Sequence, residues 1–202
     1  MSFTGFWMLT TAADEQIQTW RERYADELAA GTEHREQVMA WWADQGDVAF
    51  IELDDRHGWV WTEASRAFCD VFYDVASDDL VQEVIERIGE AGQTQSFGLG
   101  ARKSSPAAAL YHALGAVRAA RMPGCLGDFL LTADQAAAAL SEVEGLLTGA
   151  DREDLVASIC VWLDELADGP RSKGAELVDG VLRVFREAVD RELGVAAVVA
   201  CF

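Results

Sequence analysis

An acidic turn with one histidine holds the residue types in this sequence that best suit chemistry. Asp54, Asp55 and His57 follow one another at the end of an apolar segment. Carboxylates and an imidazole in one turn can exchange protons with a substrate or share a metal ion. The other histidines, His34 and His112, have no second ligand at metal-binding spacing, so we expect no metal ion and no cofactor. An enzyme that uses the acidic turn is one hypothesis, and an ordinary polar surface turn is the alternative.

Four of the seven tryptophans surround the same turn. Trp41 and Trp42 are adjacent, and adjacent residues point about 100° apart on a helix, so we expect one of the two near the surface. An exposed tryptophan beside carboxylates suits the binding of cationic or aromatic groups, because the ring supplies apolar area and cation–π attraction. For any single tryptophan, packing in the core is the alternative. The predicted partner- or ligand-binding residues are therefore Trp41, Trp42, Asp54, Asp55, His57, Trp59 and Trp61.

A basic segment in the middle of the chain is a candidate anion site. Arg102, Lys103 and Ser105 stand just before Pro106, where the sequence predicts the start of a helix. Basic side chains beside the free N–H groups of a helix start can hold an anion. The spacing of the preceding glycines matches neither a phosphate-binding loop nor a dinucleotide-binding motif, and a mobile basic loop is the alternative.

The charge of the chain excludes one class of ligand and favours another. The 202 residues include 35 acidic and 16 basic side chains, which gives a net charge of −19. Such a chain repels a phosphate backbone, so we expect no nucleic-acid partner. The first 101 residues carry 20 of the acids and 6 of the bases. This half is expected to be either a solvated face or a docking face for a basic partner.

Composition places the chain among globular proteins of a reducing compartment. Half of the residues are hydrophobic and the mean hydropathy is +0.03. The longest apolar run, residues 195–202, is much shorter than the roughly 20 residues that span a bilayer, and no signal-peptide pattern opens the chain, so we expect a cytoplasmic protein without a membrane partner. The four cysteines, at positions 69, 125, 160 and 201, form no Cys-x-x-Cys pair, and buried free thiols are expected.

Hydrophobic periodicity predicts the elements that position these residues. In the first half we expect a strand at 3–9, helices at 13–29 and 33–44 separated by Gly31, strands at 48–53 and 59–61, and a helix capped by Ser77. Residues 89–105 are rich in glycine and serine and predict one long flexible loop. The second half predicts helices that start at Ser105-Pro106, at the capping box of Thr132 and Gln135, and at Asp151, with a strand near 126–131. A last helix then leads into a buried strand at 195–202.

These elements predict a single α+β domain over residues 1–202, mainly helical, with a small mixed sheet that includes the N- and C-terminal strands. Short motifs in the same order, Gly5-Phe6, Leu53-Asp54 with Trp59, and Phe129 to Thr132, resemble the YfbM-like family of uncharacterised bacterial proteins. The third to fifth positions of the middle motif depart from the pattern of that family. The resemblance implies an α+β fold with the first and last strands in one sheet, and no functional residues.

Three functions remain open. The first is a non-catalytic acidic binding protein, of the immunity or neutralising type, that docks a basic protein through an acidic, tryptophan-bearing face. The second is a small-molecule binding or resistance protein with a tryptophan-lined pocket for a cationic or aromatic molecule. The third is an enzyme that uses Asp54, Asp55 or His57. Binding is favoured over catalysis, and the sequence does not fix the oligomeric state.

Overall fold

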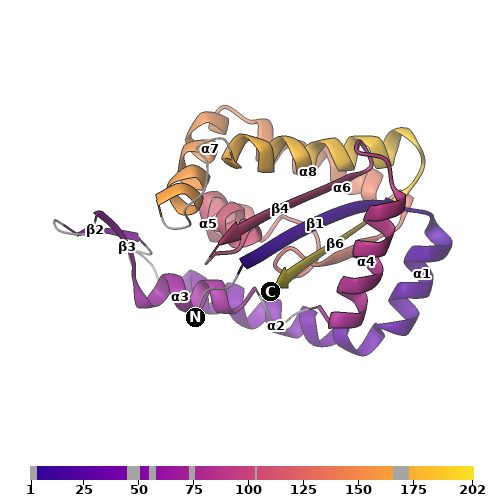
Figure 1. The fold of residues 1–202 in the computed structure, drawn as a ribbon, viewed down its shortest axis with the longest axis horizontal. Helices are drawn as coiled ribbons and strands as arrows, with labels where there is room; N and C mark the ends of the chain where they lie inside the picture. Colours follow the sequence, from indigo (N-terminus) through magenta and orange to yellow (C-terminus); the bar gives the residue numbers. More distant parts are fainter. Residues whose placement is uncertain (1–3, 45–50, 55–57, 73–75, 103, 166–172) are drawn as a thin grey trace.

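The two ends of the chain meet at the centre of a four-stranded sheet. The computed structural model describes residues 4–44, 51–54, 58–72, 76–102, 104–165 and 173–202. The sheet has the order β4-β1-β6-β5, with bounds of Thr4–Ala12 for β1, Ser96–Arg102 for β4, Phe129–Leu131 for β5 and Gly194–Cys201 for β6. Thr4 and Phe202 exchange two backbone hydrogen bonds, of 2.8 and 3.0 Å, so the predicted terminal strands lie side by side (Figure 1).

Neighbouring strands of this sheet are all antiparallel, which corrects the predicted mixed sheet. Helix α8 (Lys173–Asp190) runs along the sheet (Figure 1). After it, the chain enters the sheet again at Gly194, the first residue of β6, which pairs with Ala12 at the end of β1. Strand β4 likewise enters opposite the end of β1, with Ser96 facing Thr10. Since both strands start at the end of the sheet where β1 finishes, both run against β1.

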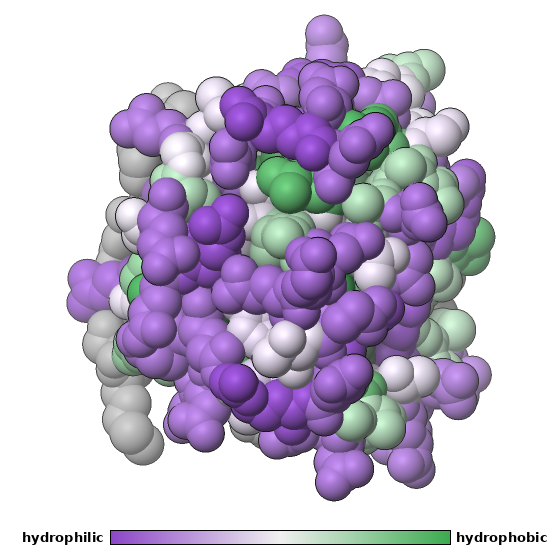
Figure 2. Space-filling model, turned by 90° about the vertical axis from the view of Figure 1, so that its right-hand side faces the viewer, coloured by the Kyte–Doolittle hydropathy of each residue, from purple (hydrophilic) through white to green (hydrophobic). Residues whose placement is uncertain are grey.

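Helices cover both faces of the sheet. Trp7 and Leu9 of β1 pack against α5 (Pro106–Ala119), α6 (Ala133–Thr148) and α8, and α7 (Arg152–Cys160) with a short π-helix (Val161–Glu165) lies behind them. Met8, on the opposite face, lies in one core cluster with residues of α1 (Asp14–Arg23) and α4 (Asp78–Glu90). Figure 2 shows that the surface at this end of the molecule is mostly hydrophilic. With both faces buried, β6 is apolar from Val195 to Ala200, as its uninterrupted hydrophobic run predicts.

The remaining elements lie along one edge of this core. They are α2 (Ala25–Asp44), α3 (Glu63–Asp70) and a separate antiparallel hairpin of β2 (Ile51–Asp54) and β3 (Gly58–Trp61). Figure 1 shows the hairpin projecting from the body of the molecule. The predicted pairing of 48–53 with 59–61 is confirmed for the described strands, and residues 48–50 lie outside the described part.

Two predicted boundaries in the first half are wrong. The helix expected to run to residue 29 ends at Arg23, and α2 continues through Gly31 without a break. Tyr24 has φ −108° and ψ 29°, and its buried ring packs into the core beside α4. Gly31 is buried inside α2 and does not end a helix, and its carbonyl accepts a 2.7 Å hydrogen bond from the buried thiol of Cys125.

The predicted flexible loop at 89–105 is wrong over residues 96–102, which form β4. Phe97, Leu99 and Ala101 alternate with more exposed residues and pack into the core. The glycines between them hid this period, since they carry no hydrophobic side chain. They lie beside large rings and chains of β1: a Cβ added at Gly100 would approach Phe6 Cε1 to 2.6 Å.

Three predicted helix starts are confirmed by side-chain caps. Ser77 and Ser105 each accept a hydrogen bond from the backbone N–H three residues later. Thr132 and Gln135 form the complete capping box. Asp151 precedes α7, as predicted, but makes no side-chain cap. At these three capped starts, residues within four positions of one another supply the hydrogen bonds that begin the helix.

Candidate functional site

The predicted tryptophan cluster divides between core and surface. Trp42 is only 7% exposed and its ring packs 4.7 Å from that of Phe68, so it belongs to the core and cannot contact a partner. Trp41 is partly exposed, which confirms that one of the adjacent pair lies near the surface. Asp54, Trp59 and Trp61 lie in the hairpin, but their side chains are outside the described part of the structure, as are Asp55 and His57 entirely.

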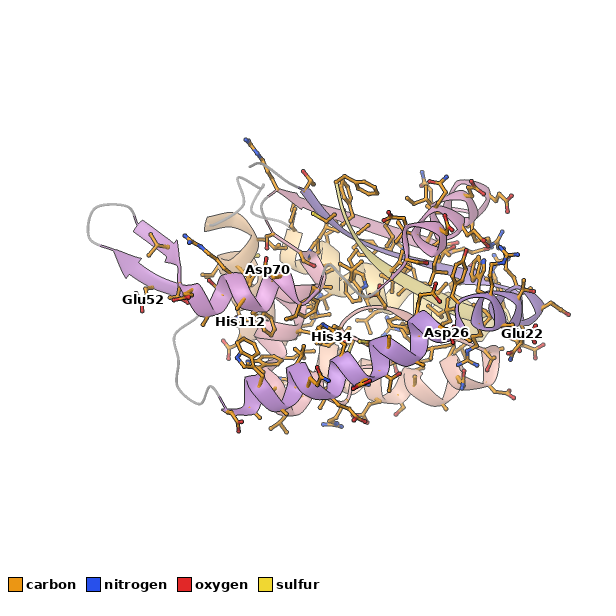
Figure 3. The ribbon with its side chains drawn as sticks, turned by 90° about the horizontal axis from the view of Figure 1, so that it is seen from below. Glu22, Asp26, His34, Glu52, Asp70 and His112 are labelled. Carbon is orange, nitrogen blue, oxygen red and sulfur yellow. The ribbon has the colours of Figure 1, made fainter. Side chains whose placement is uncertain are left out.

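Trp41 lines a groove between α2 and α3. The groove has a volume of about 320 Å³. Its lining residues come from the two helices: His34, Gln37, Val38, Trp41, Ala67 and Val71. His34 fastens the helices together, since its Nε2 lies 3.1 Å from the carbonyl oxygen of Val71. Figure 3 shows the two helices side by side, with His34 in the middle of α2.

Acidic side chains border this groove. On α2, Glu33 and Asp44 are exposed. Glu33 lies four residues before Gln37 and Asp44 three residues after Trp41, so both lie near lining residues of the groove. On α3, Glu63 and Asp70 are exposed and lie four and three residues from Ala67 on the helix, while Arg66 is the basic residue of α3. The groove therefore combines an apolar floor with a predominantly negative border.

The candidate anion site at 102–105 does not assemble in the described structure. Ser105 is fully buried and its hydroxyl caps α5 by accepting from the N–H of Ala108. Arg102 is exposed at the end of β4, and Lys103 lies outside the described part. Since the Ser105 side chain is fully buried, its hydroxyl is out of reach of an external anion.

A hydrogen-bonded cluster around the carboxylate of Glu83 joins α1 to α4, and the sequence did not reveal it. Glu83 accepts hydrogen bonds from the Trp20 indole and from the Tyr24 hydroxyl, at 2.8 Å, and pairs with Arg23. Burial alone would raise the pKa of Glu83, but the two hydrogen bonds and the arginine charge outweigh burial and lower it. Both carboxylate oxygens thus have protein donors, and the cluster is a structural clamp.

A second hidden cluster surrounds the turn at 124–128. Gly124, Leu126 and Gly127 have φ angles of 72°, 49° and 106°, a left-handed conformation that is rare for leucine. Two side chains hold the turn, because the Gly127 carbonyl accepts a 2.8 Å hydrogen bond from the Trp7 indole and its N–H donates to the Tyr111 hydroxyl at 3.1 Å. The strand predicted near 126–131 is therefore confirmed only over Phe129–Leu131, since residues 126–128 belong to this turn.

Asp128 closes this turn and is buried with an incomplete set of hydrogen bonds. Its Oδ1 accepts from the Val199 N–H at 2.6 Å, and its Oδ2 has no hydrogen-bond partner among the described residues. Burial raises the pKa of Asp128 well above its ordinary value, because the low-dielectric surroundings favour the neutral form of the carboxyl. Burial also raises the pKa of the neighbouring Cys125 thiol to about 12, which makes it a poor nucleophile.

The thiols differ from the predicted pattern. Cys69 and Cys125 are buried, as expected, but Cys160 is half-buried and Cys201 is exposed at the end of β6, where the sheet runs out. All four are thiols and not disulfides, and burial raises the pKa of Cys69 to about 12. Within the described residues, no group of three or more histidine, cysteine, aspartate or glutamate side chains is arranged to hold a metal ion.

His112 lies in the core and not in a site. Its ring packs 4.5 Å from that of Trp162 and 6.3 Å from that of Phe68. Burial lowers the pKa of His112 to about 4, so the imidazole is neutral at physiological pH. The His112 ring packs against the core, and protonating it would lower the free energy of unfolding.

No protein-family model, curated protein or solved structure matches the chain. The resemblance to the YfbM-like family therefore stays a prediction. No helix in the described part of the chain combines the length and the apolar character needed to cross a bilayer. The function has to be argued from the surfaces of the molecule.

Proposed function

We propose that the protein is a non-catalytic acidic binding protein of the immunity or neutralising type, and that it docks a basic protein partner in the α2–α3 groove. One observation supports this most: an apolar groove of about 320 Å³ that contains the partly exposed Trp41 lies between helices whose outer edges carry exposed acids. Apolar anchors surrounded by charge are typical of surfaces in which the centre supplies affinity and the border steers association.

The chemistry of the groove selects the partner. Val38, Ala67 and Val71 offer an apolar floor, so the bound segment needs an apolar side chain at its centre. Glu33, Asp44, Glu63 and Asp70 favour lysine or arginine on either side of that anchor. The net charge of −19 adds a long-range attraction for any basic partner, which salt would weaken.

The proposal is tested by capture from a lysate with three forms of the full-length protein. The groove variant carries Glu33→Lys and Asp70→Lys, one change on each wall. The control variant carries Glu22→Lys and Glu86→Lys, exposed acids on α1 and α4, and has the same net charge. Wild type and control should retain a basic protein at low salt that the groove variant loses, and high salt should release it.

Two outcomes would contradict the proposal. Equal retention by the groove and control variants would mean that net charge alone attracts the protein. A retained partner that is acidic, or that high salt does not release, would remove the electrostatic argument. Salt-insensitive quenching of tryptophan fluorescence by a small cationic or aromatic molecule, abolished by Trp41→Ala, would favour the small-molecule alternative instead.

A further inference from the structure

A second pocket lies on another flank of α2, between that helix and the segment that leads into β5. Its volume is about 360 Å³, within the lower part of the range of small-molecule sites. Helices α1 and α2 supply Arg21, Thr32 and Arg35, and the segment 124–131 forms the other wall. The groove of Trp41 shares none of its lining residues, so the two sites are separate.

The polar groups of this pocket are mainly hydrogen-bond donors. Each guanidinium carries five N–H donors, and the bonds of Arg21 to the Gln135 side chain and of Arg35 to the carbonyls of Ala120 and Met122 all use Nη2. Those bonds hold both arginines in place. In a chain with 35 acids and 16 bases, this pocket is unusual because two arginines and one acid, Asp128, line it.

Asp128 provides a further polar group at the inner wall. It is 5% exposed and lines the pocket, and its Oδ2 has no hydrogen-bond partner among the described residues. A buried polar atom without a partner is uncommon in folded proteins and calls for a ligand or a water molecule. Burial raises the pKa of Asp128, which favours its uncharged form and lessens its repulsion of an anion in the pocket.

Apolar side chains also line the pocket. Leu28 comes from α2, and Phe129 and Leu131 come from the other wall, so both walls offer contact to a carbon skeleton. A pocket that combines positive charge with hydrocarbon fits an amphipathic anion better than an inorganic ion.

We infer that this pocket binds a small organic oxyanion, a carboxylate or a phosphate monoester, whose charged group pairs with Arg21 and Arg35 and whose carbon skeleton contacts Leu28, Phe129 and Leu131. The Thr32 hydroxyl and the Asp128 carboxyl complete the polar contacts. This inference is independent of the proposed partner groove.

Amide chemical-shift titration of the full-length protein tests the inference, with benzoate and phenyl phosphate as probes and phenol as the neutral control, at constant ionic strength. Both anions should give saturable shifts of the amides of Thr32, Gly124 and Leu131, and phenol should not. Arg21→Gln and Arg35→Gln should each weaken binding by about tenfold or more, because each removes a charge-assisted hydrogen bond.

Arg183→Gln is the matched control, since Arg183 also donates its Nη2 to a backbone carbonyl, that of Ser96, but lies on α8 outside the pocket. It should bind the probes as wild type does. In the described part of the structure Arg21 donates to the Gln135 side chain and not to a backbone carbonyl, so Arg21→Gln should disturb the fold less than Arg35→Gln. If Arg35→Gln unfolds, Arg21→Gln still tests the inference. The inference is overturned if neither anion gives saturable shifts at the pocket, if phenol binds as well as benzoate, or if Arg21→Gln binds as tightly as Arg183→Gln.

Discussion

Replacing Asp128 by asparagine should remove a pH-dependent loss of stability. Asparagine has nearly the same shape as a protonated aspartate, and its Oδ1 can still accept from the Val199 N–H. It cannot ionise. The variant therefore keeps the hydrogen bond from the Val199 N–H and removes the free-energy cost of ionising the buried carboxyl.

The sign and size follow from proton linkage. The pKa of Asp128 is raised in the folded protein, so between its unfolded value, near 4, and its folded value the native state holds one proton more than the unfolded chain. The free energy of unfolding of the wild type thus falls by about 1.4 kcal/mol for each pH unit of increase in that window. Asp128→Asn lacks this contribution, so its advantage over wild type should grow by about 1.4 kcal/mol per pH unit.

Urea unfolding followed by circular dichroism at pH 5, 6 and 7 measures this difference. Asp190→Asn, which removes an exposed carboxyl at the end of α8, is the control, and its difference from wild type should change much less with pH. A constant difference between Asp128→Asn and wild type from pH 5 to pH 7 would refute the reasoning, because it would mean that the buried carboxyl ionises at no cost. A variant that loses stability relative to wild type as the pH rises would show that the structure stabilises the anion.

Three further predictions concern other buried groups. The folded pKa of His112 is about 4 against an ordinary 6.5, so protonation favours the unfolded chain, and His112→Gln should gain about 2 kcal/mol relative to wild type between pH 7 and pH 5 in urea unfolding. In the native protein, Ellman's reagent should label Cys201 first and Cys160 more slowly, and should reach Cys69 and Cys125 only after unfolding. Gly180→Ala should lower the free energy of unfolding by about 1–3 kcal/mol, because the new Cβ would lie 2.2 Å from Phe97 Cδ2.

Each of these has an outcome that would contradict it. A pH-independent difference for His112→Gln would mean that the buried imidazole titrates as it does in the unfolded chain. Four fast thiols in the native protein would show that Cys69 and Cys125 are accessible. Gly145→Ala is the control for Gly180, since nothing lies within 4 Å of its added Cβ, and it should gain up to about 1 kcal/mol from helix propensity. Equal effects at the two glycines would exclude the clash with Phe97.

The helix starts and the terminal strands were predictable because they depend on local chemistry. Ser77, Ser105 and Thr132 each cap the helix that follows with their own hydroxyl, so the information lies within four residues. The apolar run at 195–200 could only form a strand buried on both faces. The surface position of one of Trp41 and Trp42 followed from helix geometry alone.

What failed were interpretations in which glycine was taken to end or loosen an element. Gly31 lies buried inside α2, and its carbonyl accepts a hydrogen bond from Cys125, 94 residues away. Gly100 lies in β4 because the Phe6 ring occupies the space of a side chain. A single sequence does not show which distant residue fills the space beside a glycine, so glycines that break elements and glycines that permit close packing look the same.

The sequence by itself determined the α+β class, the negative charge and the residue types of the candidate binding surface, since these follow from composition and local periodicity. Only the tertiary structure decided which residues form sites. It placed Trp42 in the core and Trp41 in a groove with α3, and it brought Arg21 and Arg35 to one pocket with Asp128, about a hundred residues away along the chain. The physical reason is that burial and hydrogen-bond partners, which set the charge state of Asp128 and the exposure of Trp41, come from packing between segments remote in sequence.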